Sequence, residues 1–183
     1  MKRVFNIILA AIITFCLLML LERAYASQYI QGTPRVIDGD TIELNGEKIR
    51  LACVDTPESN YRGKTQYCLD NETDCGKLAK EALQNMIGTH DVMCWYDKRD
   101  VYGRILGFCQ QYEFLSNFYT GYLYNYMLLE QGYAWYYNGG KECKKYEEAF
   151  LDAKKEGYGL FNEEFGGFKE PKLWRKIEVI IKF

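Results

Sequence analysis

The chain has 183 residues, of which 48% are hydrophobic and 26% are charged. This length predicts one domain with a sizeable core, and the composition excludes an intrinsically disordered chain. The formal net charge is −2, so any binding to nucleic acid must depend on a local group of cationic side chains. The single histidine excludes mechanisms that need two histidines.

Residues 1–26 have the parts of an export signal. A basic start precedes an apolar run over residues 4–21, and a small-x-small motif ending at Ala26 offers a cleavage site. The run is 18 residues long, just enough to span a bilayer, so the segment is either cleaved or kept as a membrane anchor. The remaining chain is therefore expected to be secreted or periplasmic, or else membrane-anchored and facing outside the cytoplasm. Its net charge is about −4, because the signal carries three basic residues and one acidic residue.

Residues 35–55 predict a three-stranded meander. Apolar and polar residues alternate within it, Asp38-Gly39 marks the first turn, and Asn45-Gly46 is a strong two-residue hairpin signal. The third strand is expected to run from residue 48 to residue 54. Residues 59–73 are polar without periodicity, which is typical of a loop.

Helical spacing of apolar residues predicts a helix over residues 78–87, with Gly88 as its stop. Residues 92–96 and 104–109 predict two strands of a hairpin. No clear pattern covers residues 112–121.

Two further helices are expected after this segment. A short one runs over residues 125–131 and ends at Gly132, and a longer one stops at Gly157. The longer helix carries Cys143, Tyr146, Phe150 and Ala153 on one face. Five strands and three helices predict an α+β fold, in which a small closed barrel would leave no strand edge exposed.

Six cysteines follow the signal, and an even number in an exported chain predicts disulfides. A zinc site is the competing interpretation, but the sequence has no C-x-x-C pair and one histidine. Cys68 and Cys75 close a short loop before the first helix, which suggests that they pair. Cys94 and Cys109 lie on neighbouring strands of the predicted hairpin, which suggests a second pair. The remaining two cysteines either pair with each other or leave the first as a buried thiol. The expected pairs are Cys68–Cys75, Cys94–Cys109 and, from the remainder, Cys53–Cys143.

Three acids are candidates for chemistry. Asp40 follows the first turn of the meander, and Asp55 and Glu58 flank Thr56-Pro57 at its end. Each has a plain alternative, because Asp-Gly is a turn pair and Asp-Thr-Pro-Glu is a strand exit. Their clustering favours a site, since the Asn45-Gly46 hairpin brings the strands together and gathered oxygen ligands suit Ca²⁺ or Mg²⁺.

Two arginines accompany the acids. Arg50 interrupts an apolar strand, where an unpaired charge would be costly, so it is either a functional residue or the partner of a nearby aspartate. Arg104 opens a strand, where a surface arginine is the ordinary interpretation.

The order of these residues resembles the staphylococcal nuclease family. The resemblance covers residues 33–161 and implies a five-stranded OB-fold barrel with three helices. It leaves residues 162–183, including Trp174-Arg175-Lys176, as a C-terminal tail. Three ordered motifs carry it: Val36-Ile37-Asp38-Gly39-Asp40-Thr41, Arg50-Leu51-Ala52-Cys53-Val54-Asp55-Thr56-Pro57-Glu58 and Asp100-Val101-Tyr102-Gly103-Arg104.

The resemblance implies a Ca²⁺-dependent nuclease that acts on DNA and RNA with departure of the 5′-oxygen. The implied roles are Ca²⁺ binding by Asp40, Asp55 and the Thr56 carbonyl, water activation by Glu58, phosphate binding by Arg50 and Arg104, and nucleotide binding by Tyr102. Two departures from the family concern substrate preference. The gap between Asp40 and Asp55 is shorter than in the namesake of the family, and residues 112–121 are unlike the compact hairpin expected there.

Two other function classes compete with this one. The 16 Tyr and 10 Phe could stack on bases in a non-catalytic OB-type binding module. A structural protein at the cell surface would use the aromatic tail as an interaction element. The negative charge and the presence of all five charged site residues count against the binding module, and no protein partner is inferred.

Overall fold

The protein is described by a computed structural model over residues 8–9, 11–15, 28–112 and 123–180. Most of the expected export signal and nearly all of residues 112–121 lie outside these ranges, so the signal stays a prediction. None of the helices within the described ranges is long and apolar enough to cross a membrane.

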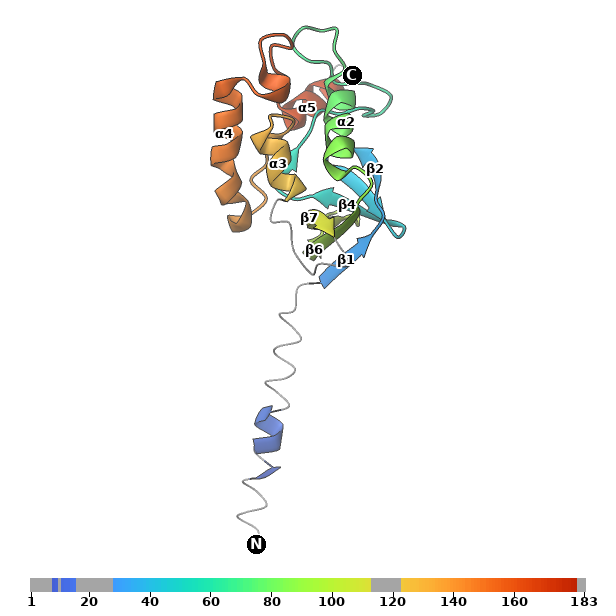
Figure 1. Ribbon diagram of the computed structural model, residues 1–183, viewed down its shortest axis with the longest axis vertical. Helices are drawn as coiled ribbons and strands as arrows, with labels where there is room; N and C mark the ends of the chain where they lie inside the picture. Colours follow the sequence, from blue (N-terminus) through green and yellow to red (C-terminus); the bar gives the residue numbers. More distant parts are fainter. Residues whose placement is uncertain (1–7, 10, 16–27, 113–122, 181–183) are drawn as a thin grey trace.

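A six-stranded mixed sheet forms the body of the molecule, with the strand order β1-β6-β7-β4-β3-β2 (Figure 1). The meander and the hairpin are both confirmed, and β4 and β7 form the parallel pair that joins them. The strands are β1 (Gln28–Gly32), β2 (Arg35–Asp38), β3 (Thr41–Leu44), β4 (Glu47–Leu51), β6 (Asp91–Arg99) and β7 (Ile105–Tyr112).

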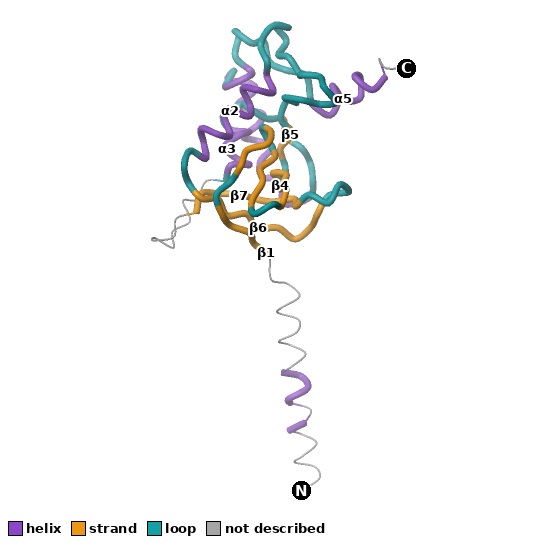
Figure 2. Tube along the Cα trace, turned by 90° about the vertical axis from the view of Figure 1, so that its right-hand side faces the viewer, coloured by secondary structure: helices purple, strands orange, loops and turns teal. Residues whose placement is uncertain are grey.

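The predicted α+β class is confirmed, but the closed five-stranded barrel is wrong. β1 was not predicted, because its mostly exposed, polar sequence shows no clear alternation, and it adds a strand to the outer edge of β6. The strands curl around a common centre (Figure 2). Among the described residues the edge strands β1 and β2 share no ladder; the Asn45 side-chain amide instead donates to the Gln31 carbonyl at 3.0 Å.

The third strand of the meander ends earlier than predicted. β4 stops at Leu51, and Cys53 has a φ of 69°, which side-chain-bearing residues rarely adopt. The chain then enters β5 (Val54–Asp55), which pairs with β8 (Trp135–Tyr136) in a separate two-stranded sheet. The Cys53–Cys143 disulfide and a 2.9 Å bond from the Tyr137 backbone amide to the Cys53 carbonyl hold this turn. This break directs Asp55 away from the large sheet.

Four α-helices lie within residues 28–180 where the structure describes them, one more than predicted. They are α2 (Cys75–Ile87), α3 (Tyr124–Glu130), α4 (Glu147–Glu156) and α5 (Pro171–Ile180). α2 begins after Asp74, whose carboxylate accepts from the Lys77 amide at 2.7 Å, and ends at Gly88 as predicted. α4 ends at Gly157 as expected.

The longer predicted helix is wrong at its start. Cys143 and Tyr146 lie in a 3-10 helix (Lys141–Tyr146) that precedes α4, although both side chains are buried as expected. A second short 3-10 helix (Gly159–Phe161) follows α4, and α5 comes after it.

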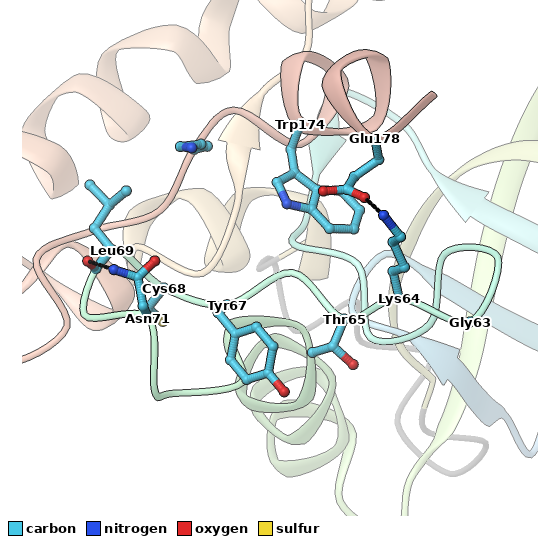
Figure 3. A pocket seen from close by; sticks show the side chains of 10 residues that line it. Gly63, Lys64, Thr65, Tyr67, Cys68, Leu69, Asn71, Trp174 and Glu178 are labelled. Carbon is cyan, nitrogen blue, oxygen red and sulfur yellow. Dashed lines mark hydrogen bonds and ion pairs between the residues drawn. The ribbon is translucent and has the colours of Figure 1, made fainter. Parts of the chain in front are cut away.

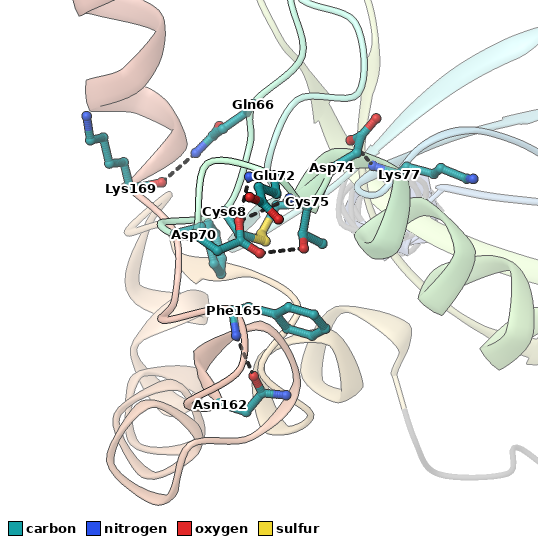
Figure 4. Close-up of a disulfide and its surroundings, with 12 residues drawn as sticks. Gln66, Cys68, Asp70, Glu72, Asp74, Cys75, Lys77, Asn162, Phe165 and Lys169 are labelled. Atoms are coloured by element: carbon teal, nitrogen blue, oxygen red, sulfur yellow. Dashed lines mark hydrogen bonds between the residues drawn. A yellow bond between two sulfur atoms is a disulfide. The ribbon is translucent and has the colours of Figure 1, made fainter.

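The core lies between the curled sheet and the helices α2 and α3. Buried side chains of β3, β4 and β7 pack there against buried side chains of the two helices, namely Ile42, Leu44, Ile49, Leu51 and Ile105 against Leu83, Leu128 and Leu129. All three expected disulfides are present, with Cα–Cα distances of 5.1 Å for Cys68–Cys75, 4.1 Å for Cys94–Cys109 and 5.2 Å for Cys53–Cys143. Figure 4 shows the first, which fastens the loop to the start of α2.

Candidate active site

Two buried carboxylates, Asp40 and Asp55, meet beside the end of β4. Asp40 lies in the turn before β3, and its carbonyl accepts from the Leu51 amide at 2.8 Å, which fixes the turn against β4. Asp55 ends β5, and the next amide, that of Thr56, donates to Asp40 Oδ2 at 3.2 Å. The two aspartates are only 4% and 2% exposed, so their charges require partners.

Arg50 is the partner that both aspartates share. It lies on β4 opposite Thr41, and its Nη1 and Nη2 are 2.6 Å from Asp40 Oδ2 and Asp55 Oδ1 respectively. Although burial alone would lower the pKa of Arg50, the adjacent carboxylates raise it above its ordinary value. The interpretation of Arg50 as the partner of nearby aspartates is therefore confirmed. Both terminal nitrogens of Arg50 are thus engaged by carboxylates, and its binding to phosphate stays a prediction.

Glu58 lies at the rim of this group, on the loop that follows β5. The buried Gln66 holds its backbone from both sides, because the Glu58 amide donates to Gln66 Oε1 at 3.4 Å and the Gln66 amide donates to the Glu58 carbonyl at 2.9 Å. Gly76, in the first turn of α2, packs on the same backbone. A Cβ at Gly76 would lie 2.4 Å from the Glu58 carbonyl carbon, so this close approach requires glycine.

The electrostatic surroundings of Glu58 favour its neutral form. Burial raises its pKa to about 7, the nearby charge of Asp40 adds to this, and Arg175 opposes it. Burial followed by the charge of Asp40 likewise raises the pKa of Asp38, which accepts from Ser59 Oγ at 3.0 Å. A carboxyl group that gains and loses a proton near neutral pH suits a general base.

Arg175 of α5 completes the group and was missed by the sequence analysis. Its Nη2 donates to Asp55 Oδ2 at 2.8 Å, and its Nη1 donates to Glu58 Oε1 at 2.5 Å. Pro171 at the first helical position was an available signal for a helix here. No local pattern, however, indicates that the arginine four residues later reaches the acids.

Arg104 and Tyr102 are not brought into contact with the acids. They lie at the turn between β6 and β7, where Arg104 Nε donates to Asp100 Oδ2 at 2.8 Å and the Tyr102 ring is 5.7 Å from the guanidinium carbon of Arg104. Alternation along β7 places Arg104 on the same face as Leu106, which pairs with Arg50. The two arginines therefore share a face of the sheet. Tyr102 is 82% exposed and is open to a ligand.

The donor set at Asp40 and Asp55 fits a hard divalent cation. The described residues contain no group of three or more His, Cys, Asp or Glu side chains arranged to hold a metal, but the implied set has only two carboxylates and the Thr56 carbonyl. Carboxylate and carbonyl oxygens are the ligands that Ca²⁺ prefers. Burial is the main cause of the raised pKa values of Asp38 and Glu58, and the negative charge of Asp40 adds to it.

A cavity of about 470 Å³ lies between the loop after β5 and α5 (Figure 3). Its lining includes Lys64, Tyr67, Trp174 and Glu178 but none of the buried acids. The cavity lies along the flank of α5 and does not include the acid cluster.

A family model described as "Staphylococcal nuclease homologue" matches residues 48–163. Asp40 and α5 lie outside the matched segment, whereas Arg50, Asp55, Glu58 and Arg104 lie within it.

Three similar proteins come from bacteria. The chain is 38% identical over 96 residues to the succinoglycan biosynthesis protein ExoI of Rhizobium meliloti (strain 1021), covering 50% of this chain and 48% of that protein. It is 30% identical over 164 residues to the endonuclease YhcR of Bacillus subtilis (strain 168), covering 80% of this chain and 13% of that protein. It is 34% identical over 77 residues to an uncharacterized endonuclease of Escherichia coli, covering 40% of this chain and 42% of that protein. The chain thus spans less than half the length of each of these relatives.

Proposed function

Because the chain belongs to the staphylococcal nuclease family, we propose that it is a Ca²⁺-dependent nuclease that hydrolyses phosphodiester bonds of DNA and RNA. The observation that carries this proposal is the buried Asp40–Arg50–Asp55 cluster with Glu58 at its rim. The names of two relatives, which describe endonucleases, support the same activity.

Asp40, Asp55 and the Thr56 carbonyl would hold the ion. When bound, Ca²⁺ supplies a Lewis acid that polarises a phosphoryl oxygen. The deprotonated Glu58 accepts a proton from the attacking water, which requires the carboxylate form and so favours neutral to alkaline pH. Arg50 donates to the phosphate oxygens, and Arg104 approaches them from the same face of the sheet.

The relative size of these effects assigns most of the catalysis to electrostatics. Phosphodiester hydrolysis requires the site to remove on the order of 20 kcal/mol of barrier. A general base contributes about 10²–10⁴-fold, or about 3–5 kcal/mol. The remainder must come from positive charge around the phosphate and from in-line positioning, with the 5′-oxygen as leaving group and a 3′-phosphate as product.

Little sequence specificity is expected, since the proposed contacts are to phosphate rather than to base edges. Tyr102 at the exposed turn would contact a nucleotide next to the scissile phosphate. Three disulfides suit an oxidising compartment outside the cytoplasm, which agrees with the predicted export signal.

Incubation of the purified protein with DNA and with RNA, in Ca²⁺ or in EDTA, tests the proposal. We expect cleavage of both in Ca²⁺, loss of cleavage in EDTA and 3′-phosphate ends on the products. Asp40→Ala should raise the Ca²⁺ concentration needed for half-maximal rate and lower turnover. Binding without cleavage in Ca²⁺ would favour the non-catalytic OB-type module instead.

A further inference from the structure

The helix α5 places a positive charge on the acids that the proposed reaction needs. Arg175 donates to both oxygens of Asp55, at 3.1 Å to Oδ1 and 2.8 Å to Oδ2, and to Glu58 Oε1 at 2.5 Å. Asp55 Oδ1 also accepts from Arg50 at 2.6 Å. Every side-chain oxygen of Asp55 is therefore engaged by a guanidinium group.

A cation bound to Asp55 would compete with the contacts of Arg175 for the same carboxylate oxygens. Ca²⁺ takes oxygen ligands at about 2.3–2.6 Å, so an ion on Asp55 would use the same oxygen that Arg175 contacts. The two like charges would then lie within a few ångströms of each other in a buried environment that screens them poorly. Glu58 is affected as well, because its Oε1 accepts from Arg175 Nη1 at 2.5 Å.

Apart from Arg175, α5 packs only weakly against the rest of the protein, which makes displacement of the helix feasible. Within α5, all of which the structure describes, Pro171 alone is buried. Lys169, two residues before α5, is anchored through its carbonyl, which accepts from Gln66 Nε2 at 2.7 Å (Figure 4). Other side-chain contacts of α5 involve polar or aromatic groups near the surface: Trp174 with Tyr61 and Lys172 with Tyr137. Glu178 pairs with Lys64 (Figure 3). Segments with few buried apolar contacts open at low free-energy cost.

We propose that α5 is a displaceable cap on the active site, in which Arg175 competes with the divalent cation for Asp55. In the closed state, Arg175 neutralises Asp55 and Glu58 and the site is inactive. Binding of the cation to Asp40 and Asp55 displaces Arg175 and releases Glu58 to act on water. This inference rests on the proposed metal site and adds a regulatory element from outside the family-matched residues.

A different role for Arg175, as a third arginine on the scissile phosphate, predicts the opposite outcome. An arginine that stabilises the developing charge would be needed for turnover, so its removal would slow cleavage even when the cation is saturating. A displaceable cap instead lowers the affinity for the cation, because only the open fraction of molecules can bind it.

Calorimetric titration of Ca²⁺ into the full chain distinguishes these roles. If about one molecule in ten is open, the apparent Kd is about tenfold weaker than that of the open state. We therefore expect Arg175→Ala to tighten Ca²⁺ binding by about tenfold and to lower the Ca²⁺ concentration for half-maximal cleavage. Lys176→Ala removes the same charge from an exposed position on the same helix and should leave the Kd unchanged.

The fluorescence of Trp174 reports on the cap directly. Its ring packs edge-on against Tyr61 with centroids 6.2 Å apart. The emission of the Trp174→Phe variant comes from the other two tryptophans, and subtracting it from the wild-type emission isolates the signal of Trp174. We expect Ca²⁺ to shift the Trp174 emission towards that of an exposed indole. In Arg175→Ala, the shifted emission should already be present in EDTA.

Three results would overturn the inference. Equal Ca²⁺ affinities for the wild type, Arg175→Ala and Lys176→Ala would show that Arg175 does not compete with the cation, although the metal site itself would stand. A loss of cleavage of about 10²-fold or more in Arg175→Ala at saturating Ca²⁺ would instead make Arg175 a phosphate-binding residue. Failure of every variant to bind Ca²⁺ would overturn both the cap and the proposed metal site.

Discussion

The two arginines singled out by the sequence occupy contrasting surroundings. Arg50 lies among buried acids and bridges Asp40 and Asp55, so it belongs to the folded structure as much as to the site. Arg104 lies at an exposed turn and pairs with Asp100, four residues away in the sequence. The contrast teaches that the proposed active site combines a residue whose loss should destabilise the folded protein with a residue whose loss should only slow the reaction.

Substitution of Glu58, at the rim of the acid cluster, is expected to have the largest effect on the cleavage rate. Glu58→Gln keeps the shape of the side chain but cannot accept the proton, so kcat should fall by about 10²–10⁴-fold. Steady-state cleavage at saturating Ca²⁺ measures this. Glu142→Gln, which changes an exposed acid paired with Lys98, should lose little. A fall in kcat of equal size in both variants would remove Glu58 from the mechanism.

Arg50→Ala tests the buried side of the comparison. It leaves two buried carboxylates without their shared partner, so the free energy of unfolding in EDTA should fall by about 3–5 kcal/mol. Ca²⁺ should restore part of this loss by supplying positive charge at the same carboxylates. Urea unfolding with and without Ca²⁺ provides the measurement.

Arg35→Ala is the matched control for stability, because its ion pair with Glu43 is exposed and should contribute less than about 1 kcal/mol. An Arg50→Ala protein as stable as Arg35→Ala would show that the buried bridge contributes little to folding.

Arg104→Ala tests the exposed side. In its proposed role Arg104 donates to the charge that develops on the phosphate, so kcat should fall by about 10²–10³-fold. The free energy of unfolding should change by less than about 1 kcal/mol, because a surface pair is lost. Cleavage rates and urea unfolding, measured on the same preparation, give the change in kcat and the change in the free energy of unfolding.

Lys98→Ala is the control for Arg104, since it removes a nearby basic residue with its own exposed partner, Glu142. Equal and mild effects of Arg104→Ala and Lys98→Ala on kcat would make Arg104 an ordinary surface charge. Arg104→Lys should not restore full activity, because an ammonium lacks the planar fork.

The pH dependence of stability gives the smallest expected effect. Since the pKa of Glu58 is raised to about 7 in the folded protein, the native state holds a proton that the unfolded chain releases near its ordinary value. The free energy of unfolding in EDTA should therefore fall as pH rises from about 4.5 to about 7, by on the order of 2 kcal/mol. Glu58→Gln should lose this part of the dependence. An unchanged slope would show that other groups cause it.

The sequence by itself determined the local features of this protein. Alternation and turn chemistry predicted the meander and the hairpin, and glycine stops predicted the ends of α2 and α4. Spacing and elimination gave the three disulfide pairs that the structure contains. The ordered motifs predicted the family, and the hairpin between β3 and β4 predicted that Asp40 and Arg50 lie close together, whereas the expectation that Asp55 shares their sheet was wrong.

Only the tertiary structure decided which distant segments meet. The positive φ of Cys53 breaks the predicted strand and sends Asp55 to pair with Trp135, 80 residues further along the chain. Arg175 reaches Glu58 across 117 residues and Asp55 across 120. Sequence patterns report what each residue needs from its neighbours along the chain, such as a turn, a cap or a buried face. The partner of a buried charge is instead selected by packing, which brings Arg175 rather than Arg104 to Asp55 and Glu58.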